Sequence, residues 1–223
     1  MTLEIGFLVF PQVQQLDLTG PYEVLASLRD VRIHLIWKTL EPIASSTGLI
    51  LTPDTSFATS PQLGLLCVPG GVGINALLED AETIAFVSSQ AQGARYVASV
   101  CTGALLLGAA GLLGGRRATT HWNARDFLPH FGAILTEARV VQDGNLITAG
   151  GVTAGIDFGL AIVAELAGRE EAETIQLGLE YRPEPPFDAG TPETASASVL
   201  AAARQRGAQS RQAREAIIAR ICV

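Results

Sequence analysis

Short apolar runs alternate with segments of helical character, and this alternation constrains the fold more than any other feature of the chain. The runs span residues 5–10, 31–37, 65–68 and 96–100. Uninterrupted apolar runs of this length are typical of parallel strands that helices cover on both faces. The pattern therefore predicts an α/β fold around a mostly parallel sheet.

The second half of the chain predicts two more strands and a buried helix. The strands are expected at residues 139–142 and 146–149, and Asp143-Gly144 between them is typical of a tight turn, so this pair should be antiparallel. Residues 153–167 are apolar nearly all round, with Thr153 as the expected N-cap. Such a helix packs in the core or between subunits.

The C-terminal region begins with a proline-rich tether at residues 182–190, which cannot form regular structure. Residues 193–221 are rich in alanine and arginine and predict a helix that packs on its own body or on a second subunit. Five arginines between Arg204 and Arg220 indicate a solvated helix face rather than a binding patch. We expect one domain over residues 1–223, with a core at about 3–180 and the tether and tail at 181–223.

Composition narrows the partners and the compartment. Residues are 48% hydrophobic and 17% charged, and the net charge of -7 disfavours binding to nucleic acid or to an anionic membrane. No secretion signal or membrane span is evident. Three cysteines at unrelated spacings offer no metal pattern and suit a reducing compartment. We therefore expect a cytoplasmic protein that binds no metal.

Cys101 is the strongest candidate for a nucleophile. The apolar run 96–100 leads directly into a small-residue helix, and Cys101 occupies the corner between them. Such an elbow presents its side chain outside the sheet, and the following N–H groups and helix dipole favour a thiolate. The alternative is a small buried hydrophobic residue, as most free cysteines are. The corner and the Thr-Gly that follows favour the nucleophile.

Two further loops should lie beside Cys101, because ligands of parallel sheets bind beyond the carboxyl ends of the strands. The loop at 11–21 carries Asp17 ahead of a helix that Pro21 is expected to start, and Thr19 is better placed than Asp17 to cap it. The loop at 69–73 carries Gly70 and Gly71, whose N–H groups can stabilise negative charge. A phosphate-binding loop is disfavoured, because no Lys-Ser/Thr pair follows these glycines.

The three histidines receive different interpretations. His121 follows a short strand and is as well suited to capping a helix as to reaching the same crevice. His34 lies within a predicted strand and His130 near a helix end, so both are expected to be structural.

Four motifs resemble the ThiJ/PfpI superfamily, a group with a class I glutamine amidotransferase-like fold, over about residues 3–180. They lie at residues 66–71, 99–104, 110–122 and 150–157. Within the superfamily, the Asp-Leu-Thr-Gly-Pro stretch at 17–21, the Cys-Thr-Gly at 101–103 and the tail at 180–190 are similar to isonitrile hydratases.

The resemblance implies a flavodoxin-like three-layer sandwich with a C-terminal helical extension, a homodimer and no cofactor. It implies that Cys101 is the nucleophile, Asp17 the acid/base and Thr102 a polar neighbour, with oxyanion-like contacts from N–H groups near Gly71 and Thr102. The remaining residues implied to bind substrate or an oxyanion are Gly70, Val72, His121 and Val152. The superfamily's proteases and deglycases carry Glu where Asp17 stands, and the proteases carry His where Thr102 stands, which argues against proteolysis.

The residues also support an isonitrile hydratase chemistry, which is a lyase reaction of the hydro-lyase type. Attack by the Cys101 thiolate leaves negative charge on the isonitrile carbon, and Asp17 can protonate that carbon as the bond forms. Water would then hydrolyse the thioimidate to an N-substituted formamide. Asp17 can also deprotonate the thiol if its pKa is raised, so the two groups would titrate as a coupled pair.

Two other functions stay open from the sequence. The same motifs resemble the sensor domains of AraC-type regulators, which bind small ligands without catalysis, although fewer than 35 residues follow Gly190, too few for a helix-turn-helix domain. A redox-sensing cysteine protein would also use Cys101, but it gives no reason for Asp17 in place of Glu.

Overall fold

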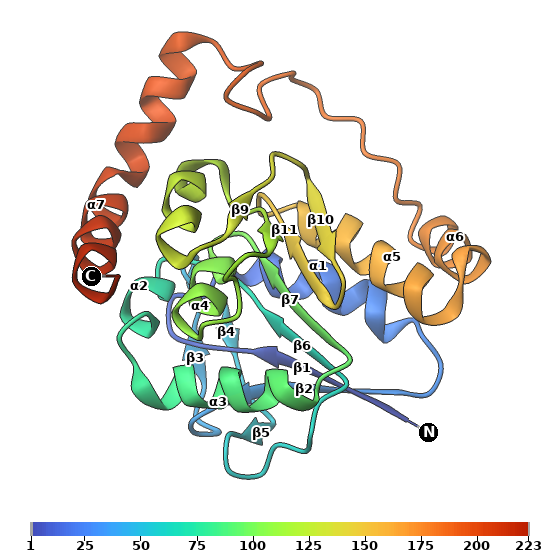
Figure 1. Ribbon diagram of the computed structural model, residues 1–223. Coiled ribbons are helices and arrows are strands. Elements are labelled where there is room, and N and C mark those ends of the chain that lie inside the picture. Colours follow the sequence, from blue (N-terminus) through green and yellow to red (C-terminus); the bar gives the residue numbers. More distant parts are fainter. Residues whose placement is uncertain (1, 223) are drawn as a thin grey trace.

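The computed structural model describes residues 2–222, which form a seven-stranded central sheet (Figure 1). The strand order is β10-β11-β7-β6-β1-β2-β5, and every neighbouring pair is parallel except β10 with β11. The strands are β1 (Leu3–Leu8), β2 (Val31–Trp37), β5 (Thr55–Ser56), β6 (Leu65–Val68), β7 (Tyr96–Val100), β10 (Val140–Asp143) and β11 (Leu146–Ala149). The predicted mostly parallel sheet is therefore confirmed.

Helices cover both faces of this sheet and create three layers. Helices α1 (Gln15–Ala26) and α5 (Ala154–Ala167) pack together on one face, and α3 (Ala81–Gly93) and α4 (Gly103–Ala109) pack on the other. Because both faces are covered, every residue of β6 and β7 is buried, which explains their uninterrupted apolar sequences.

Smaller elements complete the body of the protein. Strands β3 (Ile43–Ala44) and β4 (Ile50–Leu51) form a hairpin, and β8 (Arg117–Ala118) pairs with β9 (Ile134–Leu135). Helix α2 (Ile74–Leu77) follows β6, the 3₁₀ helix η1 (Trp122–Phe131) follows β8, and α6 (Arg169–Gly178) follows α5.

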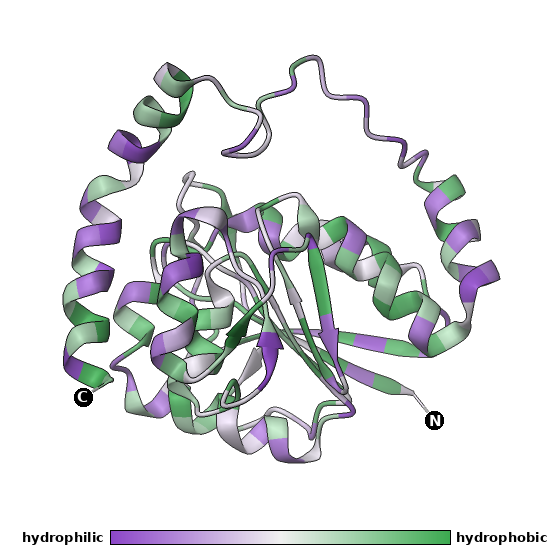
Figure 2. Ribbon diagram, turned by 45° about the horizontal axis from the view of Figure 1, so that its top comes forward, coloured by the Kyte–Doolittle hydropathy of each residue, from purple (hydrophilic) through white to green (hydrophobic). Residues whose placement is uncertain are grey.

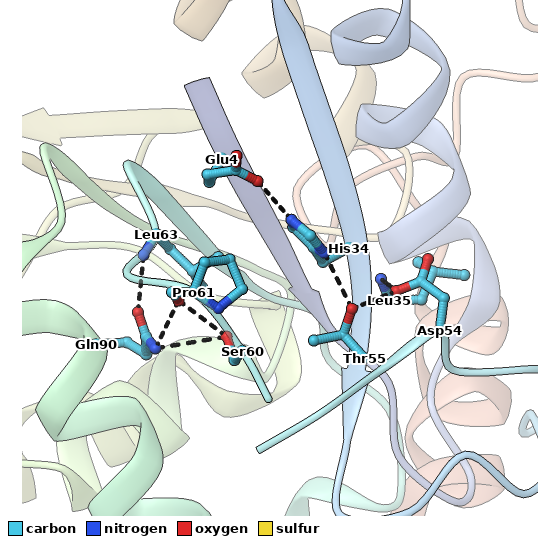
Figure 3. A network of polar contacts seen from close by, with 9 residues as sticks. All are labelled: Glu4, His34, Leu35, Asp54, Thr55, Ser60, Pro61, Leu63 and Gln90. Carbon is cyan, nitrogen blue, oxygen red and sulfur yellow. Dashed lines mark hydrogen bonds and ion pairs between the residues drawn. The ribbon is translucent and has the colours of Figure 1, made fainter. Parts of the chain in front are cut away.

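His34 belongs to a structural network at the β5 edge of the sheet, as expected (Figure 3). Its Nε2 atom lies 2.6 Å from Oε2 of Glu4, and its Nδ1 atom lies 3.0 Å from Oγ1 of Thr55, so one ring joins β1, β2 and β5. Nearby, Gln90 accepts a 2.9 Å hydrogen bond from the Leu63 N–H. These contacts satisfy polar groups where the sheet borders its connecting loops.

The start of α1 differs from the prediction. The helix begins at Gln15, so Asp17 lies in its first turn and Pro21 lies inside it instead of starting it. Thr19 is not a cap, because it too is helical and its hydroxyl donates to Oε1 of Gln15. A proline inside a helix is unfavourable, since it removes one backbone donor, and packing of α1 on α5 and the sheet overrides that preference.

Two other local predictions need correction. Strand β10 continues through Asp143, so the tight turn consists of Gly144-Asn145, with Gly144 at φ +58°. Thr153 does occupy the N-cap position of α5, but its hydroxyl makes no capping bond and instead accepts one from Nη2 of Arg139 at 3.1 Å.

The C-terminal region crosses from one side of the molecule to the other. After α6, an exposed segment arches over the body and leads into α7 (Ala197–Ile221), which packs against α2 and η1 (Figure 1). Hydrophilic and hydrophobic residues alternate along α7 (Figure 2). The expectation that this helix packs on its own body is confirmed.

The arginines of α7 correct the expectation of a solvated face. Arg204 and Arg206 are exposed, but Arg211 donates two hydrogen bonds to the Asp126 carboxylate, and Arg220 pairs with Glu79 at 2.9 Å. Arg214 is buried. The cluster therefore docks the helix. Among residues 2–222, no helix is long and apolar enough to cross a membrane.

Candidate active site

Cys101 occupies the predicted corner between β7 and α4 in a strained conformation. Its φ of +57° lies in the left-handed region, which non-glycine residues adopt at a cost of about 1–2 kcal/mol. Two hydrogen bonds hold it there: its N–H donates to the Ala149 carbonyl at 3.0 Å, and its carbonyl accepts the Thr120 hydroxyl at 2.7 Å. The residue is only 6% exposed.

Asp17 lies beside Cys101, although α1 and β7 are far apart in sequence. Its carboxyl group is fully buried, and Oδ2 accepts a 2.9 Å hydrogen bond from the Gly70 N–H. Oδ1 has no partner of regular hydrogen-bond geometry among residues 2–222. The Cys101 thiol is close enough for each group to shift the pKa of the other. The predicted meeting of these residues is therefore confirmed.

Gly70 makes this convergence sterically possible. A Cβ atom there would lie 2.6 Å from the Thr102 nitrogen, 2.7 Å from Thr102 Oγ1 and 2.8 Å from Asp17 Oδ2. No side chain fits into this space, since real Cβ atoms do not approach other atoms so closely. The glycine therefore lets the loop after β6 approach both α1 and the start of α4.

Thr102 interacts with the next residue of that loop. Its Oγ1 accepts a 3.0 Å hydrogen bond from the Gly71 N–H and lies 3.3 Å from the Gly71 carbonyl, to which it can donate. The hydroxyl makes no cap for α4. The N–H of Gly70 is bound to Asp17 and that of Gly71 to Thr102, so the oxyanion-like role of the glycine N–H groups stays a prediction.

The electrostatics of the pair combine one confirmed and one incorrect expectation. Burial raises the pKa of Asp17 to about 7, although the Gly70 N–H and the Cys101 thiol oppose the shift. Burial, followed by the Asp17 charge, raises the pKa of Cys101 above its usual value, and this outweighs the Thr102 N–H. The expectation that the corner position favours a thiolate is therefore wrong, because desolvation exceeds the effect of the helix N-terminus.

A cavity of about 430 Å³ lies next to Thr120 and Ala149, which hold the Cys101 backbone, although Cys101 and Asp17 do not line it. His121 and Val152 line it, together with Gly150 and Arg125. Val72 lies elsewhere, on the outer side of the glycine loop, where its side chain is half exposed. Of the residues expected to bind substrate, His121 and Val152 therefore share one cavity. Gly70, Gly71 and Val72 belong to the loop after β6 and do not line that cavity.

His121 acts as a cap in the structure. Its Nδ1 atom accepts a 3.2 Å hydrogen bond from the Asn123 N–H at the start of η1. Burial, together with the charges of Arg214 and Arg125, lowers the pKa of His121 to about 4, so its ring is neutral at pH 7. His130 lies exposed in the last turn of η1, outside the cavity.

Sequence reasoning missed the role of Thr120, which holds the Cys101 carbonyl. The residue is fully buried, and in the sequence it is only one position of the motif at residues 110–122. A threonine beside a short strand carries no signal for such a distant contact. Residues 2–222 contain no cluster of three or more His, Cys, Asp and Glu side chains that could hold a metal ion. The arrangement is suited to addition by a thiol coupled to proton transfer.

The chain is similar to known proteins over almost its whole length. The chain is 60% identical over 220 residues to the isonitrile hydratase of Pseudomonas putida, covering 99% of this chain and 96% of that protein. The crystal structure of a ThiJ/PfpI family protein from Pseudomonas syringae superposes with a TM-score of 0.95 at 46% identity, covering 98% of this chain and 91% of the other.

More distant similarity extends to a regulator. The HTH-type transcriptional regulator GbdR of Pseudomonas aeruginosa is 31% identical over 179 residues, which cover 77% of this chain but 48% of the regulator.

The model of the DJ-1/PfpI family matches residues 4–165, a span that includes Asp17, Gly70 and Cys101. The chain therefore belongs to the DJ-1/PfpI family.

Proposed function

We propose that this protein is an isonitrile hydratase, a lyase of the hydro-lyase type that converts isonitriles to N-substituted formamides without a cofactor. The observation that carries the proposal is the buried pair of Asp17, with a pKa raised to about 7, and the thiol of Cys101. Identity of 60% over almost the whole chain to the Pseudomonas putida isonitrile hydratase supports the substrate class.

The first step adds the thiol across the terminal carbon of the isonitrile. Asp17, in its ionised form, takes the proton from Cys101 as Sγ forms a bond to that carbon. The electron pair that remains on the carbon takes this proton back from Asp17, which gives a thioimidate with one new S–C and one new C–H bond. A carboxyl group with a pKa near 7 suits both transfers.

The second step consumes one water molecule and restores the thiol. Water adds to the thioimidate carbon, the S–C bond breaks with its electron pair on sulfur, and the nitrogen and sulfur each end with one proton. The products are the N-substituted formamide and the Cys101 thiol. Asp17 returns to its ionised form and is the base beside the reacting carbon in this step too.

The remaining site residues receive supporting roles. We propose that the Thr102 hydroxyl keeps the glycine loop in place through Gly71 and that the cavity of His121 and Val152 receives the substituent of the isonitrile. Gly70, Gly71 and Val72 bound the opposite side. Substrate that displaces Thr102 from the Gly71 N–H would free that donor for developing negative charge.

We also propose a cytoplasmic homodimer that binds neither nucleic acid nor membranes. The free thiols of Cys67, Cys101 and Cys222 suit a reducing compartment. The β3–β4 hairpin and the glycine loop both contact Val13. Exposed Ile50 on the hairpin and exposed Val72 on the glycine loop support a protein interface there.

The alternatives receive less support. A redox sensor needs a thiolate that oxidises readily, whereas burial raises the pKa of Cys101. A ligand-binding sensor has the weaker support of the similarity to GbdR, a transcriptional regulator that is 31% identical to this chain.

The experiment incubates the purified protein with an aromatic isonitrile in H₂¹⁸O and detects the formamide by mass spectrometry. The expected result is enzyme-dependent N-aryl formamide with ¹⁸O in its formyl group. Heat-denatured protein is the control and should give none. A folded protein with a titratable Cys101 that yields no formamide would contradict the proposal.

A further inference from the structure

Arg214 is a buried cation that the proposed mechanism does not use. It comes from α7, and the residue is only 5% exposed. Its Nε atom donates a 2.9 Å hydrogen bond to Oδ1 of Asn75. Within residues 2–222, its Nη atoms make no hydrogen bond and its guanidinium pairs with no carboxylate.

An unpaired buried guanidinium is energetically unfavourable, because the charge loses its hydration without gaining an opposite charge. The other docking arginines of α7 avoid this cost: Arg211 pairs with Asp126 and Arg220 with Glu79, both at the surface. Arg214 therefore contributes little to docking through charge. A carboxylate partner would neutralise the positive charge of Arg214, so its buried position points to a role that depends on that charge.

Helix α7 connects two segments that lead directly into the site. Asn75, in α2, follows the glycine loop by a few residues, and its Nδ2 atom donates to the carbonyl of Ser210 on α7 at 2.9 Å. On the other side, Arg211 donates to the carbonyl of Asn123, whose N–H is bound to His121. Helix α2 also packs against α4, which begins just after Cys101. The helix thus links α2, which follows the glycine loop, to the start of η1 beside His121.

The charge of Arg214 acts on Cys101 and on His121. It opposes the rise that burial and Asp17 impose on the pKa of Cys101. It also adds to the effect of burial in lowering the pKa of His121. The guanidinium therefore lies within electrostatic range of both residues, with Asn75 fixing its direction.

We propose that Arg214 makes α7 part of the active site, because its unpaired guanidinium supplies the positive charge that favours the Cys101 thiolate when sulfur attacks. Arg214 acts through Cys101, so it is a positioning residue. The inference rests on the proposed function only in taking Cys101 as the nucleophile. A cation in this place offsets part of the cost of forming an anion between Asp17 and apolar side chains.

The test is the pH dependence of Cys101 alkylation by iodoacetamide, followed by mass spectrometry on the peptide that contains Cys101. This reaction needs no isonitrile, so its outcome is independent of the proposed activity. Arg214→Met is expected to raise the apparent pKa of Cys101. Alkylation at neutral pH should become about tenfold slower for each unit of that rise. Arg214→Lys, which keeps the charge, is expected to restore most of the rate.

Arg211→Met is the matched control, since it removes a docking contact of the same helix without removing the charge next to Cys101. It is expected to keep the wild-type profile. If Arg214→Met does not fold, Arg214→Gln removes the charge and can still hydrogen-bond to Asn75. An unchanged profile in the neutral variants, or an equal change in Arg211→Met, would overturn the proposal.

Discussion

The Gly70 N–H donates a 2.9 Å hydrogen bond to Oδ2 of Asp17, and this contact joins the loop after β6 to α1 directly beside Cys101. It fixes one carboxyl oxygen and leaves the other, Oδ1, buried without a regular partner. A buried acceptor in this state is unfavourable in the resting protein. It is suited to receive a proton from the neighbouring thiol.

Gly70→Ala is expected to abolish most activity and to destabilise the protein. The added methyl group would collide with the Thr102 nitrogen at 2.6 Å, which is backbone and cannot rotate away. Gly178→Ala at the end of α6 is the control, because a Cβ atom there meets nothing within 4 Å. Thermal unfolding and formamide production check both variants. A Gly70→Ala protein with wild-type activity would contradict the crowded geometry.

Asp17→Asn is expected to keep the fold and lose most of the rate. Wild-type kcat/KM should rise about tenfold per pH unit below the Asp17 pKa of about 7 and level off above it, because only the carboxylate accepts the thiol proton. The residual rate of Asp17→Asn should lack this rise near pH 7. A rise that persists unchanged in Asp17→Asn would assign it to another group.

The same carboxyl predicts a pH-dependent stability. Between pH 4 and 7 the unfolded chain releases the Asp17 proton while the folded protein keeps it, so the free energy of unfolding falls as pH rises. The whole decrease in the free energy of unfolding is on the order of 4 kcal/mol, and none of it occurs below pH 4. The stability of Asp17→Asn relative to wild type should therefore increase from pH 4 to 7. Denaturant unfolding at several pH values measures this difference, and a constant difference would contradict it.

Thr102→Val is expected to have a smaller effect than changes at Cys101 or Asp17. It removes the hydroxyl that receives the Gly71 N–H, a loss of about 1 kcal/mol or about fivefold in kcat/KM. Thr102→Ser keeps the hydroxyl and should stay near wild type. If Thr102→Val is as inactive as a Cys101 variant, Thr102 takes part in the chemistry itself.

The sequence predicted the strands of the sheet well because their apolar runs report burial on both faces. The bounds of β2, β6, β7 and β11 agree with the prediction. The corner position of Cys101 followed from that pattern. Asp17 was found through its place after β1, although the start of α1 was wrong because Pro21 was interpreted as a helix start.

Features that depend on three-dimensional contacts could not be predicted. The pKa of Cys101 is raised because burial outweighs the helix N-terminus, and the depth of burial at a corner cannot be read from neighbouring residues. Arg214 was missed because an arginine-rich helix does not indicate which face docks. The extent of the single domain over residues 1–223 stays a prediction.

The most direct test of the account compares formamide production by the wild type, Cys101→Ala and Cys67→Ala. Cys67 is the matched control, because it is a fully buried thiol in β6 whose pKa burial also raises. The account predicts no turnover by folded Cys101→Ala and near wild-type turnover by Cys67→Ala. Wild-type turnover by Cys101→Ala would contradict the proposed covalent mechanism.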